Sequence, residues 1–505
     1  MFDFKKLFVL DMANNHQGLV EHGCEIIKQN AAVVKKNGLR AAIKFQFRQL
    51  ESFVHPDHRE QSENKHINRF WATNLEHHHY ETMLSQVRDC GLLGMCTPFD
   101  EESVDIITDM GFDLMKVASC SARDWPLLEK VAAAGLPTVI STGGLILKNI
   151  DELVSFCTHR GMDFALMHCV SIYPTPDEKC NLSQIDVLRE RYKDCVIGWS
   201  THENPKDCSP IQIAQAKGAE MFERHIGLET KEIELNAYSS TPNQVDAWMQ
   251  AYKKGFALCG DRERKPDLLE IESLNSLKRG VFAKKKIGRG QILKREQVFF
   301  AMPYAEGQLD SGSWNENIAA LDDFAQNQPI MIEEIKRPFD PSSQVLKEAT
   351  HQAKAMLTIA KIELSSEFEV EFSHHYGIEN FLTTGAIIIN CINRSYCKKI
   401  IIQLPGQSHP SHFHKRKEES FQILSGTLVV SLEGKIRTMT AGETCLIQEG
   451  VWHSFSSESG CIFEEVSTTH YDDDSFYKDK KIDRLARKDR KTLVDNWGRF
   501  EKKAV

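Results

Sequence analysis

Eight short apolar runs, each followed by polar residues and a segment of helical periodicity, occupy roughly the first 260 residues. The runs are nearly continuous rather than alternating, as expected of parallel strands buried on both faces. Several intervening segments end in Gly, a helix-stop signal. The expected strands lie at residues 7–16, 41–47, 93–99, 114–121, 137–144, 164–171, 195–202 and 221–227. This pattern predicts an α/β fold, a (β/α)8 TIM barrel, over residues 1–265.

The rest of the 505-residue chain changes character twice, which suits a length that is too great for one core. Residues 274–340 combine short apolar runs with Gly turns and predict a small β-rich domain. After a helical segment, β-type runs dominate and predict a second β-rich domain at 345–480. The densely charged residues 481–505 are expected to form a tail at the surface.

Composition narrows the class of protein. The net charge of −9 gives no basic footprint for nucleic acid or an anionic membrane. No stretch approaches the roughly 18 to 20 apolar residues of a membrane span, and the N-terminus has no secretion signal. The 14 Cys are scattered, without a C-x-x-C pair, as is typical of free thiols in a reducing compartment. The sequence therefore predicts a cytoplasmic protein without nucleic-acid or membrane partners.

Polar side chains gather at the carboxyl ends of the expected strands, where TIM barrels carry their active sites. Two lysines and a ring of hydroxyls suit a phosphate and a carboxylate. Two histidines at the ends of strands seven and eight suit one divalent ion with positions open to substrate. The residues are Asp11, Asn14, Asn15, His16, Lys44, Gln46, Thr97, Lys116, Ser119, Ser121, Ser141, Thr142, His168, Ser171, Tyr173, Ser200, His202 and His225. Any one of these residues would most often have a structural role, but together at the strand ends they predict an active site.

Seven short motifs carry these residues: KFQ (44–46), CTPF (96–99), KVAS (116–119), STGG (141–144), HCVSIYPTP (168–176), GWSTH (198–202) and ERHIG (223–227). In this order they resemble the sialic acid synthase family of phosphoenolpyruvate-dependent enzymes. The domain at 274–340 is similar to the antifreeze-like (SAF) domain that follows the barrel in that family. The resemblance covers about residues 5–340.

The resemblance implies a metal-dependent transferase of the N-acetylneuraminate synthase type (EC 2.5.1.-), which condenses phosphoenolpyruvate with a sugar aldehyde and releases phosphate. The expected catalytic residues are Asp11, His202 and His225. His202 and His225 would hold Mn²⁺, or Mg²⁺ or Co²⁺, to polarise the aldehyde. Gln46 and Tyr173 would face the sugar. Phosphoenolpyruvate would be held by Lys44, Thr97, Lys116, Ser119, Ser141, Ser171 and Ser200. The family also implies a homodimer with swapped SAF domains.

The chain departs from the family pattern mainly at sugar-facing positions. Asp11 replaces a Glu, Ser121 an acidic residue and Ser171 an Asn, while Leu235 lies where an Asp is expected. Met302 replaces an arginine that, in the family, reaches the partner's active site and contacts the acyl group of the sugar. Because the phosphoenolpyruvate and metal residues are mostly kept while sugar-facing ones are changed, we expect a different acceptor sugar. A barrel that has lost catalysis is the alternative.

A second constellation lies near residue 412. Gly406 begins the spacing G-x5-H-x-H-x4-E-x6-G, with His412, His414 and Glu419, and His453 follows in GETCLIQEGVWH. Alternation along a strand places the two closely spaced histidines on one face. Three imidazoles and a carboxylate suit Mn, Zn, Fe or Ni. The spacing resembles both cupin motifs, and predicts a metal-binding cupin β-barrel at 345–480.

The flanks of these motifs, 372–407 and 463–477, resemble cupins of the D-lyxose isomerase type. An aldose–ketose isomerase could prepare the acceptor for the synthase, but it needs a carboxylate beside the metal, which spacing alone does not identify. Three interpretations stay open: a synthase with an isomerase cupin, a synthase with a sugar-sensing cupin, and a non-catalytic sugar-binding scaffold.

Overall fold

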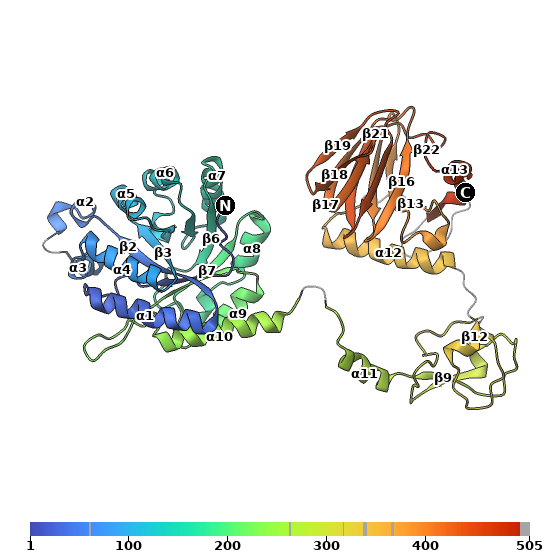
Figure 1. The fold of residues 1–505 in the computed structure, drawn as a ribbon, viewed down its shortest axis with the longest axis horizontal. Helices are drawn as coiled ribbons and strands as arrows, with labels where there is room; N and C mark the ends of the chain where they lie inside the picture. Colours follow the sequence, from blue (N-terminus) through green and yellow to red (C-terminus); the bar gives the residue numbers. More distant parts are fainter. Residues whose placement is uncertain (60–61, 262–263, 317, 337–340, 365–367, 495–505) are drawn as a thin grey trace. The chain divides into compact units, whose positions relative to one another are not determined.

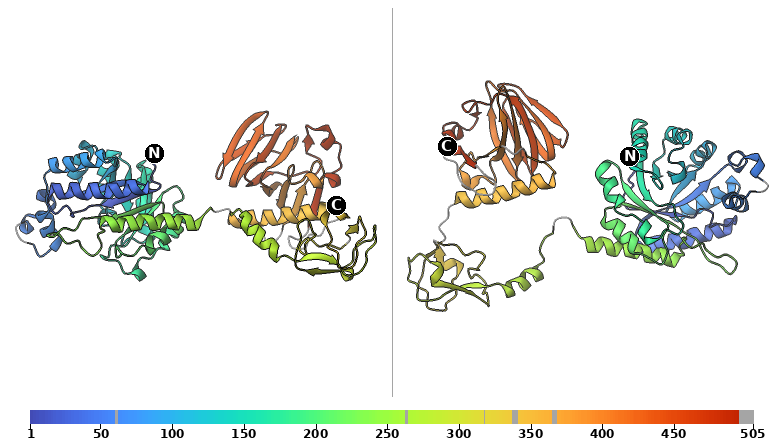
Figure 2. Two further views of the ribbon diagram at one scale, coloured as in Figure 1. Left: turned by 60° about the horizontal axis from the view of Figure 1, so that its bottom comes forward. Right: turned by 180° about the vertical axis from the view of Figure 1, so that it is seen from behind.

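A computed structural model of the chain describes residues 1–494 apart from 60–61, 262–263, 317, 337–340 and 365–367. The chain divides into two compact units, Met1–Lys265 and Pro266–Val505 (Figures 1 and 2). Each unit has its own hydrophobic clusters and is described separately.

The first unit is a closed barrel of eight parallel strands, in which each strand pairs with the next and β8 pairs with β1 (Figure 1). All eight predicted strands are present, and the predicted (β/α)8 fold is confirmed. The strands are β1 (Leu7–Asp11), β2 (Arg40–Phe47), β3 (Leu93–Pro98), β4 (Leu114–Val117), β5 (Thr138–Ser141), β6 (Phe164–Cys169), β7 (Ile197–Thr201) and β8 (Met221–His225).

Helices between the strands pack around the barrel (Figure 2). They are α1 (Val20–Asn37), α2 (Leu50–Phe53), α3 (Lys65–Ala72), α4 (His77–Asp89), α5 (Glu101–Asp109), α6 (Trp125–Ala134), α7 (Leu147–His159), α8 (Gln184–Arg191), α9 (Ser209–Ala216) and α10 (Pro242–Cys259). The long connection after β2 contains the short helices α2 and α3.

The barrel interior is layered, because alternate residues of each strand point inward. Its lower layer is apolar and consists of Leu7, Val9, Ala42, Met95, Leu114, Val139, Ala165, Met167 and Met221. The next residues on the same faces of β2, β4 and β8 are Lys44, Lys116 and Glu223, and all three are buried. The apolar layer therefore forms the floor on which a charged layer rests.

The second unit begins with helix α11 (Leu268–Leu277) and a small β-rich domain. β9 (Gly280–Ala283) pairs with β10 (Val298–Ala301), and β11 (Ala319–Ala320) pairs with β12 (Ile335–Lys336). Its core consists of Val281, Ala283, Ile287, Leu293, Val298, Leu309, Ile318, Ala320, Phe324, Ile330 and Ile335. A small β-rich domain was predicted here; its assignment as an SAF domain stays a prediction, and residues 337–340 lie outside the described part.

A curled antiparallel sheet forms the C-terminal domain and confirms the predicted cupin fold. Helix α12 (Pro341–Ile359) packs on it through Leu346, Ala349 and Ala353 (Figure 1). The strands are β13 (Glu369–Ser373), β14 (Ala386–Asn393), β15 (Tyr396–Gln403), β16 (Gln407–Phe413), β17 (Glu419–Leu432), β18 (Lys435–Thr440), β19 (Thr444–Ile447), β20 (His453–Ser457), β21 (Cys461–Thr468), β22 (Phe476–Tyr477) and β23 (Lys491–Val494).

The start of the predicted charged tail, 481–505, differs from expectation. After the short helices α13 (Lys480–Asp483) and α14 (Arg487–Arg490), strand β23 pairs with β13. Val494 is buried, and the Nζ of Lys491 lies 2.7 Å from the buried carboxylate of Glu371. Strand pairing, buried apolar residues and ion pairs to Glu371 thus attach this charged segment to the sheet. Residues 495–505 lie outside the described part of the chain.

None of the helices in the described residues is long and apolar enough to cross a membrane. All 14 Cys of the chain are described and none forms a disulfide, in agreement with the expected free thiols.

Candidate active site in the barrel and metal centre in the cupin

A cavity of about 990 Å³ opens at the carboxyl ends of the barrel strands. It is lined by all twelve barrel residues to which the family resemblance gives a catalytic, metal-binding or substrate-binding role: Asp11, Lys44, Gln46, Thr97, Lys116, Ser119, Ser141, Ser171, Tyr173, Ser200, His202 and His225. The fold therefore brings the predicted set into one place, although it does not assign each residue its ligand.

The floor of this cavity is a compact cluster of opposite charges. The Nζ of Lys44 lies 2.5 Å from Oε1 of Glu223 and 3.0 Å from Oδ2 of Asp11. The Nζ of Lys116 lies 3.3 Å from Oε2 of the same glutamate. Burial alone would lower the pKa of Lys44, but the two carboxylates raise it above its ordinary value. Both partners of each pair are buried, so the lysines are held in place before any ligand binds.

Glu223 was not singled out from the sequence, although it lies within the quoted ERHIG motif. It precedes His225 by two residues on β8 and therefore shares its inward face. Burial would raise the pKa of Glu223, but Lys116 and Lys44 hold it below its ordinary value. Its carboxylate thus carries a charge between two lysines that come from β2 and β4.

Hydroxyl groups surround this charged floor. The Nζ of Lys116 donates to Oγ of Ser141 at 2.5 Å, and the backbone N–H of Gly143 donates to Oγ of Ser119 at 3.0 Å. The buried Oγ1 of Thr97 has no hydrogen-bond partner among the described residues. A buried hydroxyl without a partner is unfavourable unless a ligand supplies one. These donors suit the oxygens of a phosphate or a carboxylate.

Two imidazoles also line this cavity. The Nδ1 of His202 lies 2.8 Å from the carbonyl oxygen of Val170, and the Nδ1 of His225 lies 3.2 Å from Oδ2 of Asp11. The ring centroids of the two histidines are 5.3 Å apart. Burial lowers the pKa of His225 to about 4, so this imidazole is neutral, as a metal ligand must be. With its Nδ1 engaged, His225 has its Nε2 atom left for a divalent ion. Burial would lower the pKa of His202, but a hydrogen bond with the Cys169 thiol raises it, so a divalent ion held by both imidazoles would take the place of that contact.

Cys169 is a further neighbour that the sequence reading missed. It lies at the end of β6 and lines the cavity. Burial would raise the pKa of its thiol, but a hydrogen bond with His202 and the charge of Lys116 bring it down to about 7. The thiol therefore adds a polarizable group beside one of the two imidazoles.

Some of the strand-end residues noted in the sequence serve packing instead. His168 contacts the carbonyl oxygen of Cys180 at 2.9 Å and stacks on Trp199, away from the main cavity. Asn15 lines the cavity and also has a packing role, because its Nδ2 donates to the carbonyl oxygen of Ile226 at 2.7 Å and so joins the first and last strand ends. Ser121 is buried in a short 3-10 turn and does not line the cavity.

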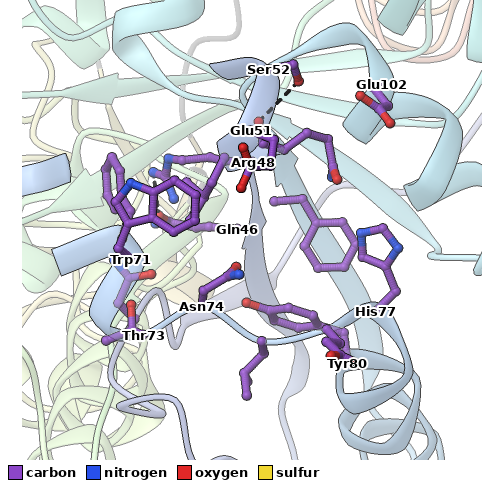
Figure 3. Close-up of a pocket in the computed structure, with 17 residues that line it drawn as sticks. Gln46, Arg48, Glu51, Ser52, Trp71, Thr73, Asn74, His77, Tyr80 and Glu102 are labelled. Atoms are coloured by element: carbon purple, nitrogen blue, oxygen red, sulfur yellow. Dashed lines mark hydrogen bonds between the residues drawn. The ribbon is translucent and has the colours of Figure 1, made fainter. Parts of the chain in front are cut away.

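A second cavity of about 430 Å³ adjoins the first and shares Asn14, Gln46, Arg48 and Phe70 with it. Figure 3 shows Trp71 on one side of this second cavity and His77 and Tyr80 on the other. The sequence reading did not predict it, because its walls come from the connection after β2.

The cupin holds the converging groups that its spacing predicted. The ligand atoms of His412, His414 and His453 lie within 4.8 Å of one another, the only such group of three found in the described residues. Glu419 joins them: its Oε1 is 3.3 Å from Nε2 of His414 and its Oε2 is 3.3 Å from Nε2 of His453. All four side chains are buried.

The hydrogen bonds of these histidines also fit a metal ion. Each Nδ1 lies against a backbone carbonyl oxygen: that of Pro410 for His412, Asp474 for His414 and Val451 for His453. The Nε2 atoms of His414 and His453 and the Oε2 of Glu419 are buried without a hydrogen-bond partner in the described part of the chain. Engaged Nδ1 atoms and free Nε2 atoms are the arrangement of metal-ligating histidines.

Beyond these four side chains the cupin buries further charges. Lys417 contacts both Glu419 and Glu465, the latter at 3.1 Å from Nζ to Oε1. The Nζ of Lys399 lies 3.3 Å from the same Oε1 of Glu465. Burial would lower the pKa of Lys417, but the two carboxylates raise it. Lys417 thus links Glu419 to a second buried carboxylate, that of Glu465.

Comparisons with known proteins agree with this geometry. Residues 32–264 match the NeuB family and residues 400–463 a cupin domain. The chain is 40% identical to a candidate spore coat polysaccharide biosynthesis protein E from Chromobacterium violaceum; the match covers 66% of this chain and 100% of that one, with a TM-score of 0.64.

Two curated proteins are more distant relatives. The chain is 29% identical to an uncharacterized protein of Methanocaldococcus jannaschii over 57% of this chain and 82% of that one. It is 28% identical to the N-acetylneuraminate-9-phosphate synthase of Drosophila melanogaster over 57% of this chain and 81% of that one. The chain belongs to the NeuB family and carries a cupin domain in addition.

Proposed function

We propose that the barrel condenses phosphoenolpyruvate with a sugar aldehyde to give a sugar acid of the sialic or nonulosonic type, with release of phosphate. The observation that carries this proposal is the single cavity in which Lys44 and Lys116, held by Glu223, face His202 and His225. The relatives that are sialic and pseudaminic acid synthases support the same reaction class.

In the proposed reaction the floor binds the two anionic groups of phosphoenolpyruvate. Lys44 and Lys116 supply charge, while Thr97, Ser119, Ser141, Ser171 and Ser200 supply hydroxyl donors. Because Asp11 and Glu223 already orient the ammonium groups, little reorganisation is needed when the substrate arrives. Gln46 and Tyr173, which line the same cavity, would orient the sugar.

Water is the third reactant of the proposed condensation. A bond forms between C3 of phosphoenolpyruvate and the aldehyde carbon, water adds at C2, and the bond between C2 and the phosphate oxygen breaks. Mn²⁺, Mg²⁺ or Co²⁺ bound through His202 and His225 would supply Lewis-acid polarisation of the aldehyde. Asp11, which contacts Nδ1 of His225, would keep that imidazole in the tautomer that presents Nε2.

Consumption of phosphoenolpyruvate with Mn²⁺ and a panel of aldoses, hexosamines and N-acylated sugars tests this proposal. We expect stoichiometric phosphate release with at least one sugar, and its loss in Lys116→Met and His225→Ala. Arg123→Gln, at an exposed ion pair with Glu152, is the matched control. A folded protein that binds a sugar yet releases no phosphate with any of them would favour the non-catalytic scaffold.

For the cupin we propose aldose–ketose isomerisation, with Mn, Zn, Fe or Ni bound through His412, His414, Glu419 and His453. The contact chain from Glu419 through Lys417 to Glu465 favours it over a sugar sensor. Isomerisation moves a proton between neighbouring carbons, and Glu465 is a carboxylate near the metal ligands that could carry it.

Ketose formation from an aldose panel is the test. Wild type should isomerise one aldose, and both Glu465→Gln and the double variant His412→Ala/His414→Ala should not. Glu443→Gln, at an exposed pair with Arg437, serves as the control. A wild type without isomerase activity, whose condensation rate responds to an added sugar only when His412 and His414 are intact, would support the sensing cupin instead.

We further propose a cytoplasmic homodimer in which the SAF-like domain, 274–340, reaches the partner's barrel. The support is the family resemblance alone, and Met302, exposed at 53%, cannot replace the missing arginine contact. Sedimentation should give twice the 57.5 kDa chain mass, and a monomer would contradict the proposal.

A further inference from the structure

One arginine lies where the two cavities of the barrel meet. Arg48 follows β2 and continues the inward face of Lys44 and Gln46. At about 3.3 Å per residue, it lies roughly 13 Å along the strand from Lys44. Its Nη2 donates to Oε1 of Gln46 at 3.0 Å, which places its guanidinium one layer outside the residue proposed to face the sugar.

Aromatic rings hold this guanidinium in a defined plane. Its central carbon lies 3.9 Å from the ring centroid of Phe70 and 3.6 Å from that of Phe99. The Nε atom is buried and has no hydrogen-bond partner among the described residues. A planar fork with open donors is the geometry that recognises phosphate or carboxylate oxygens.

The electrostatics at this place differ from those at the floor. Lys44 and Lys116 each contact a carboxylate, whereas within the described residues no carboxylate oxygen lies within 4.0 Å of Arg48. The same holds, in the described part of the chain, for Arg69 and Lys65 of α3, which line the same cavity. Burial lowers the pKa of Arg48 to about 10, so it stays charged at neutral pH.

We infer that Arg48 and Arg69 bind a phosphate carried by the acceptor at the end away from its aldehyde, so that the natural acceptor is a phosphorylated sugar. The inference rests on the proposed condensation. The anions of phosphoenolpyruvate have the lysines and hydroxyls of the floor, which leaves the outer arginines for a second anion. Phosphoenolpyruvate itself is the other source of a phosphate, and the experiment separates the two.

Matched pairs of acceptors test the inference, for example mannose with mannose 6-phosphate and N-acetylmannosamine with its 6-phosphate. The readout is the ratio of kcat/KM for the phosphorylated to that for the unphosphorylated member. Loss of a charge-assisted hydrogen bond corresponds to about a 10- to 100-fold change. We expect wild type to favour the phosphorylated member by at least about tenfold, and Arg48→Met to bring the ratio close to one.

Two variants complete the set. Arg69→Gln, whose side chain is half-buried at the cavity rim, should lower the ratio less than Arg48→Met does. Arg123→Gln, at its exposed ion pair, should leave the ratio as in wild type. A wild-type ratio near one, or an Arg48→Met variant whose loss is equal for both members and lies in the KM for phosphoenolpyruvate, would overturn the inference.

Calorimetric titration keeps this inference distinct from the proposed condensation. Mannose 6-phosphate, mannose and phosphoenolpyruvate are each titrated into wild type and Arg48→Met with Mn²⁺ present. Arg48-dependent binding of mannose 6-phosphate without any condensation would contradict the synthase and leave the anion site standing. Binding of mannose 6-phosphate that is equal in both proteins would contradict the anion site whatever the catalytic result.

Discussion

The barrel site and the cupin site use the same residue types in opposite ways. In the barrel site, the carboxylates of Asp11 and Glu223 contact lysines, and the imidazoles of His202 and His225 lie together. In the cupin, the carboxylate of Glu419 lies among three imidazoles, and a lysine contacts it from outside. The comparison teaches that buried lysines hold the carboxylates of the barrel floor, whereas imidazoles surround the carboxylate of the cupin cluster.

We expect the largest effect from a substitution that removes the shared negative charge of the barrel floor. Glu223→Gln leaves two buried lysines without their shared carboxylate, and breaking a buried pair costs about 3–5 kcal/mol. We expect kcat/KM for phosphoenolpyruvate to fall by about 1,000-fold. Coupled assays of phosphate release measure it.

The matched control is Glu220→Gln, at a surface pair with Lys5, which should change kcat/KM by less than about twofold. If Glu223→Gln behaved like this control, the idea that the carboxylate positions the lysines would be wrong.

The next largest effect concerns metal affinity, which we expect to be lower in the barrel than in the cupin. Four protein groups converge in the cupin and two imidazoles in the barrel, so a chelator should remove the barrel metal first. We expect dialysis against EDTA to abolish condensation, Mn²⁺ to restore it, and about one ion per chain to stay bound throughout. Metal analysis of the dialysed protein provides the measurement.

His412→Ala/His414→Ala should lower the affinity for that retained ion by more than about 100-fold. An ion retained equally well by this variant would show that the tight site lies elsewhere.

A third effect concerns pH and the barrel alone. Burial, with His22 and Arg69 nearby, lowers the pKa of His16 to about 4. When the pH is below 6.5, the ordinary pKa of histidine, His16 is protonated in the unfolded chain but stays neutral in the folded barrel. The free energy of unfolding therefore falls as the pH drops from 6.5 towards 4. At pH 5 this single group accounts for about 2 kcal/mol.

Urea unfolding at pH 7 and pH 5 measures this difference. His16→Asn should show a loss of stability smaller by about 2 kcal/mol than wild type, and the exposed His159→Asn should match wild type. Equal losses in all three proteins would contradict the assignment to His16.

We expect the smallest effects from substitutions of two glycines, one in the barrel and one in the cupin. A Cβ at Gly143 would lie 2.6 Å from the hydroxyls of both Ser119 and Ser171, whereas a Cβ at Gly442 of the cupin meets nothing within 4 Å. Gly442 instead has a φ of +92°, which strains any other residue. Gly143→Ala should raise the KM for phosphoenolpyruvate by about tenfold. Gly442→Ala should leave it unchanged and destabilise the cupin by about 1 kcal/mol.

Initial rates and thermal unfolding of both variants measure these effects. A changed KM in Gly442→Ala, or an unchanged KM in Gly143→Ala, would remove the distinction between a glycine needed for space and one needed for its backbone conformation.

Sequence reasoning missed contacts that join residues far apart in the chain. Glu223 contacts Lys44 across 179 positions of the chain, and Lys417 contacts Glu465 across 48. Arg48 continues the inward face that Gln46 already indicated, so strand alternation could have suggested it. Nothing in the spacing indicated that Phe70 and Phe99 would hold its guanidinium, because they come from two other segments.

The sequence by itself determined the eight strands, the ring of residues at their ends and the four side chains that converge in the cupin. These follow from local periodicity and motif spacing, since strand ends in a barrel must converge and alternate residues must share a face. Only the tertiary structure decided which charges meet, because contacts between distant strands depend on barrel closure and sheet register. That closure sets the lysines of the barrel around Glu223 and leaves Arg48 without a carboxylate in the described part of the chain.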